Sequence, residues 1–378
     1  MEALILSCST GGGHNSAGKA VAEELERRGH SVTFMDLYEL AGEKTAEIIG
    51  NAYIKLVQKS PKAFGVVYSL GEAYRRLPVH SPVYLANKKM AECTREFLDG
   101  HHFDIVIMSH VFPAHILTNL KMHNVKLPKT MLIATDYTCI PFMEEADCDY
   151  YVIPSEELRE EFSSKGIPNE NILPFGIPVK KEFTALTTEE ARKCLHFDAE
   201  KKYILLSGGS IGVGKIEDTV EECVKYLKEN RNHELIIVCG NNQKLYESLQ
   251  NEYSGNPQIQ LLRSTNQMAE YMKACDVFIS KPGGLSSTEA AASGTPLIHI
   301  SPIPGCESRN VAFFENHGMS IYVKNPKSEL RAGLKQLENE VFVKNMEKAQ
   351  HEYIDGLALS KLCDFAEYIN NRTNPCVQ

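Results

Sequence analysis

Three short glycine-rich stretches contain the residue types from which a site for an anionic ligand is built. They are STGGGHNSAGK at 9–19, SGGSIGVGK at 207–215 and KPGGLSSTEAAASGTP at 281–296. Glycines at the start of a helix let main-chain N–H groups approach a ligand, and the helix dipole favours negative charge there. The pattern therefore predicts three strand-to-helix turns that could hold a phosphate or diphosphate. For any one of them, the alternative is a tight turn that binds nothing.

The first two stretches each differ by one residue from the phosphate loop of ATPases, G-x-x-x-x-G-K-[ST]. The position after the lysine, where a hydroxyl would bind Mg²⁺, is Ala20 in the first stretch and Ile216 in the second. Neither stretch contains G-x-G-x-x-G with a well-placed acidic residue further on, since Asp36 fits only loosely. The sequence therefore argues against an ATPase and against a nicotinamide or flavin site.

In the third stretch a helix is expected to begin near Ser286, with Glu289 three positions further on. This spacing has two interpretations, which the sequence alone leaves equally open. In the first, Ser286 and Glu289 form a capping box. In the second, the main-chain amides of Leu285 and Ser286 bind a diphosphate, and the Glu289 carboxylate accepts a hydrogen bond from a ribose hydroxyl.

Short apolar runs alternate with longer amphipathic stretches along the chain, which is typical of βαβ units. Strands are expected at 3–7, 31–35, 104–108, 129–134 and 149–153, and then at 203–207, 234–239, 258–262, 276–280 and 296–300; helical candidates include 16–28 and 155–165. We therefore predict an α/β fold with two Rossmann-like, doubly wound domains that face each other across a cleft. Ligands would bind beyond the carboxyl ends of the strands.

The expected domain limits follow from these repeats. Residues 1–177 form a first domain, 178–200 a linker, 201–355 a second domain, and 356–378 a terminal helix that could cross back to the first domain. A chain of 378 residues with 43% hydrophobic and 24% charged residues belongs to the globular class, not to the disordered, collagen-like or coiled-coil classes. The net charge of −9 argues against general nucleic-acid binding.

The cysteines and the hydropathy of the chain indicate the cellular compartment in which the protein is expected. The eleven cysteines are scattered and include no C-x-x-C pair, so reduced thiols in a cytoplasm are expected instead of a disulfide framework or a zinc cage. No apolar stretch approaches the ~18 residues of a membrane span. The N-terminal residues lead directly into an expected strand, so no export signal is expected.

Taken in order, the motifs resemble those of the monogalactosyldiacylglycerol synthase and processive diacylglycerol glucosyltransferase family, relatives of the bacterial glycosyltransferase that makes lipid II. The matching segments are STGGGHNSAGKA at 9–20, SHVFPA at 109–114, ATDY at 134–137, VIPSEELREEF at 152–162, FGIPVKKEF at 175–183, SGGS at 207–210, KPGGLSSTEAAASGTP at 281–296 and PIPGCESRN at 302–310. The resemblance implies the GT-B fold and an inverting transfer of a hexose from a UDP-sugar to diacylglycerol, with no metal and no other cofactor.

The resemblance also implies the residues of a nucleotide-sugar site: Gly12, Gly13, Lys180, Gly209, Ser210, Thr265, Gly284, Leu285, Ser286, Glu289, Cys306, Glu307 and Asn310. Within this set, Ser210 and the amides of the third stretch contact the diphosphate, Glu289 holds the ribose, and Glu307 and Asn310 contact sugar hydroxyls. Lys180 lies near the nucleotide.

Two departures from the family pattern limit what the resemblance implies. Cys306 stands where the family usually has glutamine, which leaves the identity of the hexose open. The segment TDYTCIPFMEE lacks the histidine and tryptophan that often follow the TD pair, so the acceptor stays open as well. The alternatives are a transferase acting on a polyprenyl or non-lipid acceptor, a UDP-sugar epimerase, and a non-catalytic UDP-sugar sensor. An intact GGGH motif and Glu289 argue against the sensor.

Inverting transfer requires a base for the acceptor hydroxyl and a way to stabilise the departing UDP. His14 is the candidate base, because imidazole with a pKa near ~6.5 is largely neutral at cytoplasmic pH. Asp136 is the rival base or an acceptor-positioning residue, and His14 could instead cap a helix or bind a phosphate. No D-x-D motif is expected at a strand end: the candidates Asp147-Cys148-Asp149 and Asp276 lie at strand starts, as fold features would.

A local basic segment predicts contact with a membrane. Residues 51–90 contain seven Lys or Arg residues and a single acid, Glu72, interleaved with tyrosine and phenylalanine. Such a composition suits an anionic lipid surface, so we expect a cytoplasmic enzyme held peripherally on the inner face of the cell membrane. The residues predicted to face the membrane or acceptor are Tyr53, Lys55, Phe64, Tyr68, Arg75 and Arg76. The alternative is a solvated helical pair whose tyrosines pack inward.

Overall fold

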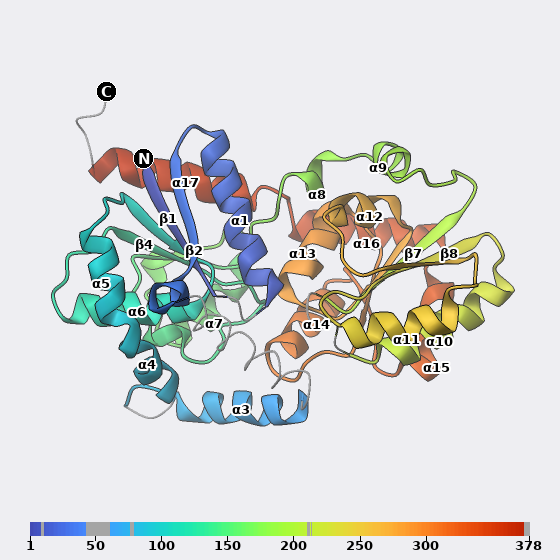
Figure 1. The fold of residues 1–378 in the computed structure, drawn as a ribbon, viewed down its shortest axis with the longest axis horizontal. Helices are drawn as coiled ribbons and strands as arrows, with labels where there is room; N and C mark the ends of the chain where they lie inside the picture. Colours follow the sequence, from blue (N-terminus) through green and yellow to red (C-terminus); the bar gives the residue numbers. More distant parts are fainter. Residues whose placement is uncertain (9–10, 43–60, 76–78, 210–211, 213, 374–378) are drawn as a thin grey trace. The chain divides into compact units, whose positions relative to one another are not determined.

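The computed structural model describes residues 1–8, 11–42, 61–75, 79–209, 212 and 214–373, without the side chains of residues 61–64, 67 and 373. The chain divides into two compact units. The first unit comprises residues 1–180, 304–306 and 357–378, and the second comprises residues 181–303 and 307–356. Each unit contains one six-stranded sheet flanked by helices (Figure 1). Four predicted site residues lie outside the described residues: Tyr53, Lys55, Arg76 and Ser210.

The first sheet has the strand order β2-β1-β3-β4-β5-β6, and all its strands are parallel. Its strands are β1 (Glu2–Ser7), β2 (Ser31–Asp36), β3 (Ile105–Met108), β4 (Lys129–Ile133), β5 (Tyr150–Val152) and β6 (Ile172–Leu173). The α-helices of this unit are α1 (Gly12–Arg27), α3 (Pro61–Tyr74), α4 (Pro82–Asn87), α5 (Ala91–Asp99), α6 (Val111–Met122), α7 (Arg159–Ser164) and α17 (Ala358–Thr373). Short 3₁₀ turns are η1 (Leu37–Ala41), η2 (Lys88–Met90), η3 (Met143–Glu145), η4 (Glu156–Leu158) and η5 (Asn169–Asn171).

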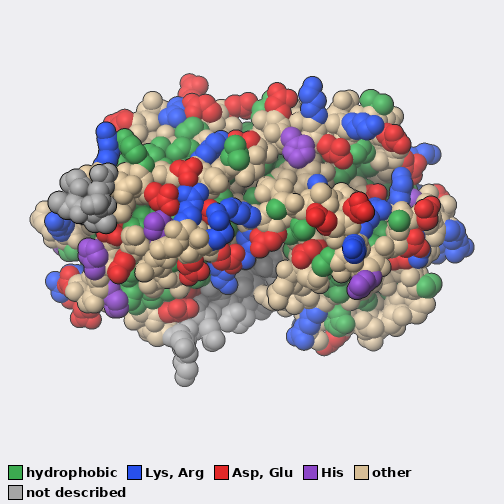
Figure 2. Space-filling model, turned by 90° about the horizontal axis from the view of Figure 1, so that it is seen from above, with side chains coloured by type: hydrophobic (Ala, Val, Ile, Leu, Met, Phe, Trp, Pro, Cys, Tyr) green, Lys and Arg blue, Asp and Glu red, His purple; other side chains and the backbone are tan. Residues whose placement is uncertain are grey.

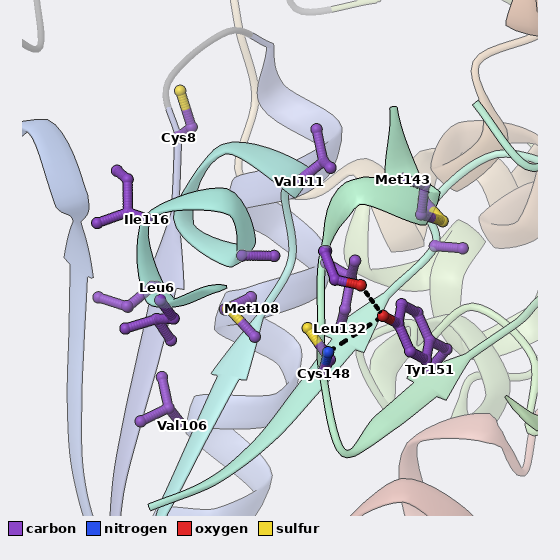
Figure 3. Close-up of a cluster of buried hydrophobic side chains, with 14 of the residues drawn as sticks. Leu6, Cys8, Val106, Met108, Val111, Ile116, Leu132, Met143, Cys148 and Tyr151 are labelled. Atoms are coloured by element: carbon purple, nitrogen blue, oxygen red, sulfur yellow. Dashed lines mark hydrogen bonds between the residues drawn. The ribbon is translucent and has the colours of Figure 1, made fainter. Parts of the chain in front are cut away.

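The central strands of the first sheet consist of nearly continuous apolar residues. Since successive side chains of a strand point to opposite sides, both faces of the sheet are apolar. One face packs against α6 and its neighbours, as Figure 3 shows for side chains of the strands and of α6. In this core the Tyr151 hydroxyl accepts a hydrogen bond from the Cys148 amide at 3.1 Å and donates one to the Ala146 carbonyl. The other face packs against α1 and α17, with Ile5 and Ile107 meeting Leu25 and Leu362.

The final helix, α17, belongs to the first unit although it follows the whole second unit in sequence. Its apolar residues Leu359, Leu362 and Ala366 are part of the core beneath α1. Ion pairs add to this packing: Arg28 binds Asp364 at 2.6 Å, and His30 contacts a carboxylate of the same helix at 2.8 Å.

The second sheet has the order β12-β11-β10-β7-β8-β9, again all parallel. Its strands are β7 (Lys202–Ser207), β8 (His233–Val238), β9 (Ile259–Leu262), β10 (Val277–Ser280), β11 (Leu297–Ile300) and β12 (Ile321–Val323). Its helices are α8 (Glu182–Ala185), α9 (Thr188–Cys194), α10 (Ile216–Glu229), α11 (Gln243–Tyr253), α12 (Met268–Ala274), α13 (Gly284–Ser293), α14 (Cys306–Asn316), α15 (Pro326–Gln336) and α16 (Glu340–Tyr353). Read from β9, this is the Rossmann strand order.

The predicted fold class is confirmed, and all ten expected strands are present with ends that differ by at most one residue. The edge strands β6 and β12 were not predicted, because they have only two and three residues. The expected helix at 155–165 is a 3₁₀ turn followed by the short helix α7. The stretch 178–200, predicted as a linker, contains α8 and α9.

Two surface properties can be stated for the part of the chain that the structure describes. Among these residues, no helix combines the length and apolar character needed to cross a bilayer. Figure 2 shows acidic and basic side chains interspersed over one face of the molecule, without a large area of a single sign.

Candidate active site

The strand order of the first unit brings three predicted motifs to one place. β1 lies beside β3, and β3 lies beside β4, with Leu6 opposite Met108 and Met108 opposite Leu132. The carboxyl ends of these strands therefore lie at one edge of the sheet, at the point where the order of strands reverses. The segments that follow them are the GGGH turn, the SHVFPA motif and the ATDY motif.

His14 lies in the first turn of α1, and its ring is oriented by residues from two other strand ends. Its Nδ1 is 2.9 Å from the carbonyl oxygen of Ser109 and 2.9 Å from Oγ1 of Thr135. A carbonyl oxygen can only accept, so Nδ1 carries the hydrogen, and in the neutral ring Nε2 holds the lone pair. His14 is thus set up as a proton acceptor at Nε2.

The electrostatics of the first unit keep this ring neutral. Burial lowers the pKa of His14, and this effect outweighs the opposing influences of the Asp136 charge and of the hydrogen bond to Ser109. Asp136 is half-buried after β4, beside Thr135. The alternative that His14 caps its helix is excluded, because Gly11 occupies the N-cap position without a side-chain bond.

A second histidine, His110, belongs to the same cluster and was not predicted. It is the N-cap of α6, and its Nδ1 accepts a hydrogen bond from the amide of Phe112 at 3.1 Å. Its ring meets that of His14 edge to face, with centroids 4.4 Å apart. Burial, and then the neighbouring imidazole of His14, lower the pKa of His110 well below its usual value. The SHVFPA motif contained this residue, but only the adjacency of β1 and β3 shows that it lies beside His14.

A short chain of hydrogen bonds joins the ends of β1 and β3 to the first turn of α1. The Ser109 hydroxyl donates to Ser7 Oγ at 3.1 Å, and the Ser7 hydroxyl donates to Asn15 Oδ1 at 2.5 Å. These bonds fix the turn that contains Gly12, Gly13 and His14, so the position of the imidazole is set by the sheet.

In the second unit, β7 and β10 are neighbours, with Ser207 opposite Ser280. Their carboxyl ends lead into the SGGS and KPGG turns, which therefore lie together at the Rossmann switch point of this unit. Helix α13 begins at Gly284, two residues before the expected start, and its N-cap Gly283 makes no side-chain bond. The Ser286 hydroxyl instead donates to the Gly283 carbonyl at 3.2 Å.

This geometry excludes the capping-box interpretation of Ser286 and Glu289. Both residues lie inside α13, and both are half-buried. The amides of the first helical turn, which include those of Gly284 and Leu285, point beyond the helix start, as they do in any α-helix. The end of α13 can therefore receive an anion, as the second interpretation required.

The predicted sugar-binding residues are tied directly to this turn. Asn310 of α14 donates through Nδ2 to the Pro282 carbonyl at 2.9 Å. The Glu307 carboxylate forms an ion pair with Lys281 and accepts a hydrogen bond from the Ile303 amide at 2.8 Å. Lys281 lies within a motif that the sequence singled out, but its role was not predicted.

The other predicted nucleotide-sugar residues are more dispersed. Lys180 of the first unit binds Glu23 of α1 at 2.5 Å. Thr265 accepts a hydrogen bond from the Gln267 amide at 3.0 Å. Cys306 begins α14, is half-buried and is not part of a disulfide.

The predicted membrane-facing role of Arg75 is corrected by the structure. Its side chain is only 8% exposed, and its Nε donates to Glu144 at 2.8 Å. The same guanidinium contacts Glu72 at 3.1 Å and the Ile140 carbonyl at 3.1 Å. Its charge is therefore neutralised inside the first unit.

Tyr68, predicted to face the membrane or the acceptor, is half-buried. Its ring lies against Gly305: a Cβ added to this glycine would come within 2.7 Å of a carbon of the Tyr68 ring. The φ of Gly305 is +118°. Burial raises the pKa of the Tyr68 hydroxyl. Phe64 lies on α3, and its side chain is not among those described.

Comparisons with known proteins identify both units. Residues 14–179 match the monogalactosyldiacylglycerol (MGDG) synthase family, and residues 203–361 match the glycosyltransferase family 28 C-terminal domain. A relative from Bacillus subtilis (strain 168), the processive diacylglycerol beta-glucosyltransferase, is 26% identical over 349 residues, which are 91% of this chain and 89% of the relative.

Two solved structures share the architecture of this chain over nearly its whole length. MurG of Acinetobacter baumannii superposes with a TM-score of 0.63 at 15% identity, over 97% of this chain and 99% of that one. The UDP-GlcNAc 2-epimerase of Neisseria meningitidis, bound to UDP-GlcNAc, gives 0.65 at 13% identity, over 97% and 99%. These likenesses establish the GT-B fold. The chain is therefore a glycosyltransferase of the GT-B fold, with an MGDG synthase family domain at residues 14–179 and a glycosyltransferase family 28 C-terminal domain at residues 203–361, and it is similar to the processive diacylglycerol glucosyltransferases.

Proposed function

We propose that this enzyme transfers a hexose from a UDP-sugar to diacylglycerol, with inversion at the anomeric carbon and without a bound metal. The observation that carries the proposal is the orientation of His14 in a domain of the MGDG synthase family. Its Nδ1 is held by Ser109, so its Nε2 is available to accept the proton of an acceptor hydroxyl. The B. subtilis relative bears a name that describes this acceptor class.

In the proposed reaction the acceptor oxygen attacks the anomeric carbon while the bond from that carbon to the diphosphate oxygen breaks. The proton of the acceptor hydroxyl passes to Nε2 of His14, and UDP leaves with the bonding electron pair. Because burial lowers the pKa of His14, the ring is neutral at pH 7 and can receive this proton. The positive charge that the ring then acquires is favoured by the nearby carboxylate of Asp136.

The proposal assigns the donor to the second unit, at the turns that follow β7 and β10. Main-chain amides at the start of α13 would bind the diphosphate, Glu289 the ribose, and Glu307 with Asn310 the sugar hydroxyls. The aspartates of the D-x-D sequence have other partners: Asp147 pairs with Lys121 at 2.8 Å, and Asp149 pairs with a lysine at 2.6 Å. This pairing supports a mechanism in which protein groups stabilise the leaving UDP.

We propose attachment to an anionic membrane surface through the described part of the basic segment, with contacts that differ from those predicted. Val66 and Leu70 of α3 are 59% and 63% exposed, and Leu85 of α4 is also largely exposed. Lys88 and Lys89 are exposed at the end of α4. Apolar side chains beside lysines suit the boundary between headgroups and acyl chains.

The experiment that tests the function is a radiolabel screen of UDP-glucose, UDP-galactose and UDP-N-acetylglucosamine against diacylglycerol, ceramide and a polyprenyl diphosphate. We expect labelled glycosyl-diacylglycerol from one of the UDP-hexoses, and we expect EDTA to leave the rate unchanged. Labelled product on the polyprenyl acceptor alone would overturn the acceptor assignment. Loss of turnover in EDTA that Mg²⁺ restores would overturn the metal-independent mechanism.

The same reactions test the epimerase alternative. An epimerase would convert or release the sugar of UDP-N-acetylglucosamine without any acceptor, whereas the proposed transferase requires a lipid for rapid turnover. Analysis of the nucleotide sugars in lipid-free reactions separates the two functions. A sensor would bind UDP-sugars and turn over none of them in any arm of the screen.

A further inference from the structure

The side chain of Lys281 lies between the two glycine-rich turns of the second unit. A Cβ placed on Gly209 would be 2.9 Å from Cε and 3.9 Å from Nζ of Lys281. A Cβ placed on Gly283 would be 3.8 Å from the same Nζ. Gly209 also has a φ of +70°, which side chains rarely adopt. Because these two positions are glycines, the Lys281 side chain fits between the turns and its ammonium group lies close to both.

The ammonium group is paired with Glu307, and the pair is shielded from water. The two side chains are 14% and 7% exposed, respectively. Glu307 is further held by the amide of Ile303, and α14 is attached to the same turn through Asn310. The cost of removing two charges from water offsets most of their attraction, so a buried ion pair stabilises the fold little more than a pair of apolar side chains would. Its placement calls for another explanation.

The chemistry assigned to these turns provides one. A diphosphate carries at least two negative charges, whereas the N-terminus of one helix contributes only about half an elementary charge. The ammonium group of Lys281 adds a full positive charge beside α13. Its partner Glu307 is the carboxylate assigned to the sugar hydroxyls. The ion pair therefore connects a residue expected to bind the diphosphate of the donor with a residue expected to bind its hexose.

We propose that Lys281 binds the diphosphate of the donor and that its pair with Glu307 is the donor-free arrangement. When the donor binds, the ammonium group exchanges the Glu307 carboxylate for phosphate oxygens, and Glu307 becomes available to accept hydrogen bonds from the hexose. This inference rests on the proposed function, because it takes a UDP-sugar as the ligand. It adds a diphosphate-binding residue and a coupling between diphosphate and sugar recognition.

The test compares the binding of UDP, UMP and uridine by calorimetry. The Lys281→Met variant should bind UDP about 10- to 100-fold more weakly than the wild type, because a charge-assisted contact to phosphate is lost. Its affinity for uridine should not change, and its affinity for UMP should fall by less than that for UDP. Lys344→Met is the matched control: this exposed lysine lies on α16 of the same unit and belongs to none of the glycine-rich stretches, so its loss should leave all three affinities unchanged.

The Glu307→Gln variant separates partner exchange from a merely structural pair. It should bind UDP at least as tightly as the wild type, since the ammonium group no longer has a competing carboxylate, yet it should lose turnover of the UDP-hexose. If both single variants instead weaken UDP and uridine equally, in parallel with a lower melting temperature, the pair is structural and the inference is wrong.

Two further outcomes are decisive. If Lys281→Met fails to fold because Glu307 is left charged and buried, the double variant Lys281→Met/Glu307→Gln removes both charges and should show the same selective loss of UDP affinity. A double variant that binds UDP like the wild type refutes the inference alone. A wild-type protein that does not bind UDP refutes the proposed function, and the inference with it.

Discussion

Replacement of His14 by alanine removes the only side chain that the structure orients as a proton acceptor in the described part of the first unit's GGGH turn. A positioned base contributes about 10²–10⁴-fold to a rate. Because burial keeps the ring neutral at pH 7, this whole contribution is present under assay conditions. We therefore expect His14→Ala to lower kcat at least ~100-fold.

The same substitution should leave folding and donor binding largely intact. It removes hydrogen bonds to the Ser109 carbonyl and Thr135 hydroxyl, which together contribute on the order of 1–3 kcal/mol to stability. The donor is assigned to the other unit, so UDP affinity should not change. His123→Ala is the matched control, since His123 also contacts a main-chain carbonyl through Nδ1, that of Asn119 at 2.7 Å, and should keep normal turnover.

The pH profile provides a second measurement on the same variants. Protonation of His14 abolishes its capacity as a base, so the wild-type rate should fall as pH decreases through the pKa of this residue. Since that pKa is lowered from 6.5, the half-maximal rate should lie below pH 6.5. Asp136→Asn removes a charge that raises this pKa and should move the acid limb to lower pH.

Two results would refute this reasoning. Near-normal turnover of His14→Ala, measured with saturating lipid and donor, would remove His14 from the role of base. Loss of turnover in Asp136→Asn together with survival in His14→Ala would assign the base to Asp136 instead.

The remaining predictions concern stability and membrane attachment. Arg75→Ala leaves the Glu144 carboxylate, which is 15% exposed, without its principal partner, and should cost about 3–5 kcal/mol in denaturant unfolding; a loss below 1 kcal/mol would contradict the buried ion pair. Leu70→Glu removes an exposed apolar side chain from the proposed membrane surface and should weaken binding to anionic vesicles about 10-fold or more in flotation, whereas Leu357→Glu, at another exposed leucine of the same unit, should not. Equal effects of both changes would argue against attachment through α3.

The Arg75 result illustrates the limit of reading charge from a sequence. The seven basic residues within 51–90 indicate a local excess of positive charge. The sequence does not show which of them have acidic partners more than sixty positions away. Arg75 meets Glu144 because α3 packs against the segment around Phe142, with Gly71 close to Pro141. The exposed side chains of Val66, Leu70 and Leu85 were not predicted to contribute to the proposed membrane surface.

The local pattern was sufficient to predict the α/β class, ten strands, the glycine-rich turns and the family, because these depend on side-chain alternation and on short motifs. Tertiary structure alone decided which turns meet, since strand order places β1 beside β3 and β7 beside β10. The proton position on His14 depends on a carbonyl 95 residues away, and the state of Lys281 depends on a carboxylate 26 residues away. Hydrogen bonds and ion pairs act over a few ångströms in space, so the chemistry of both turns became visible only once the chain was folded.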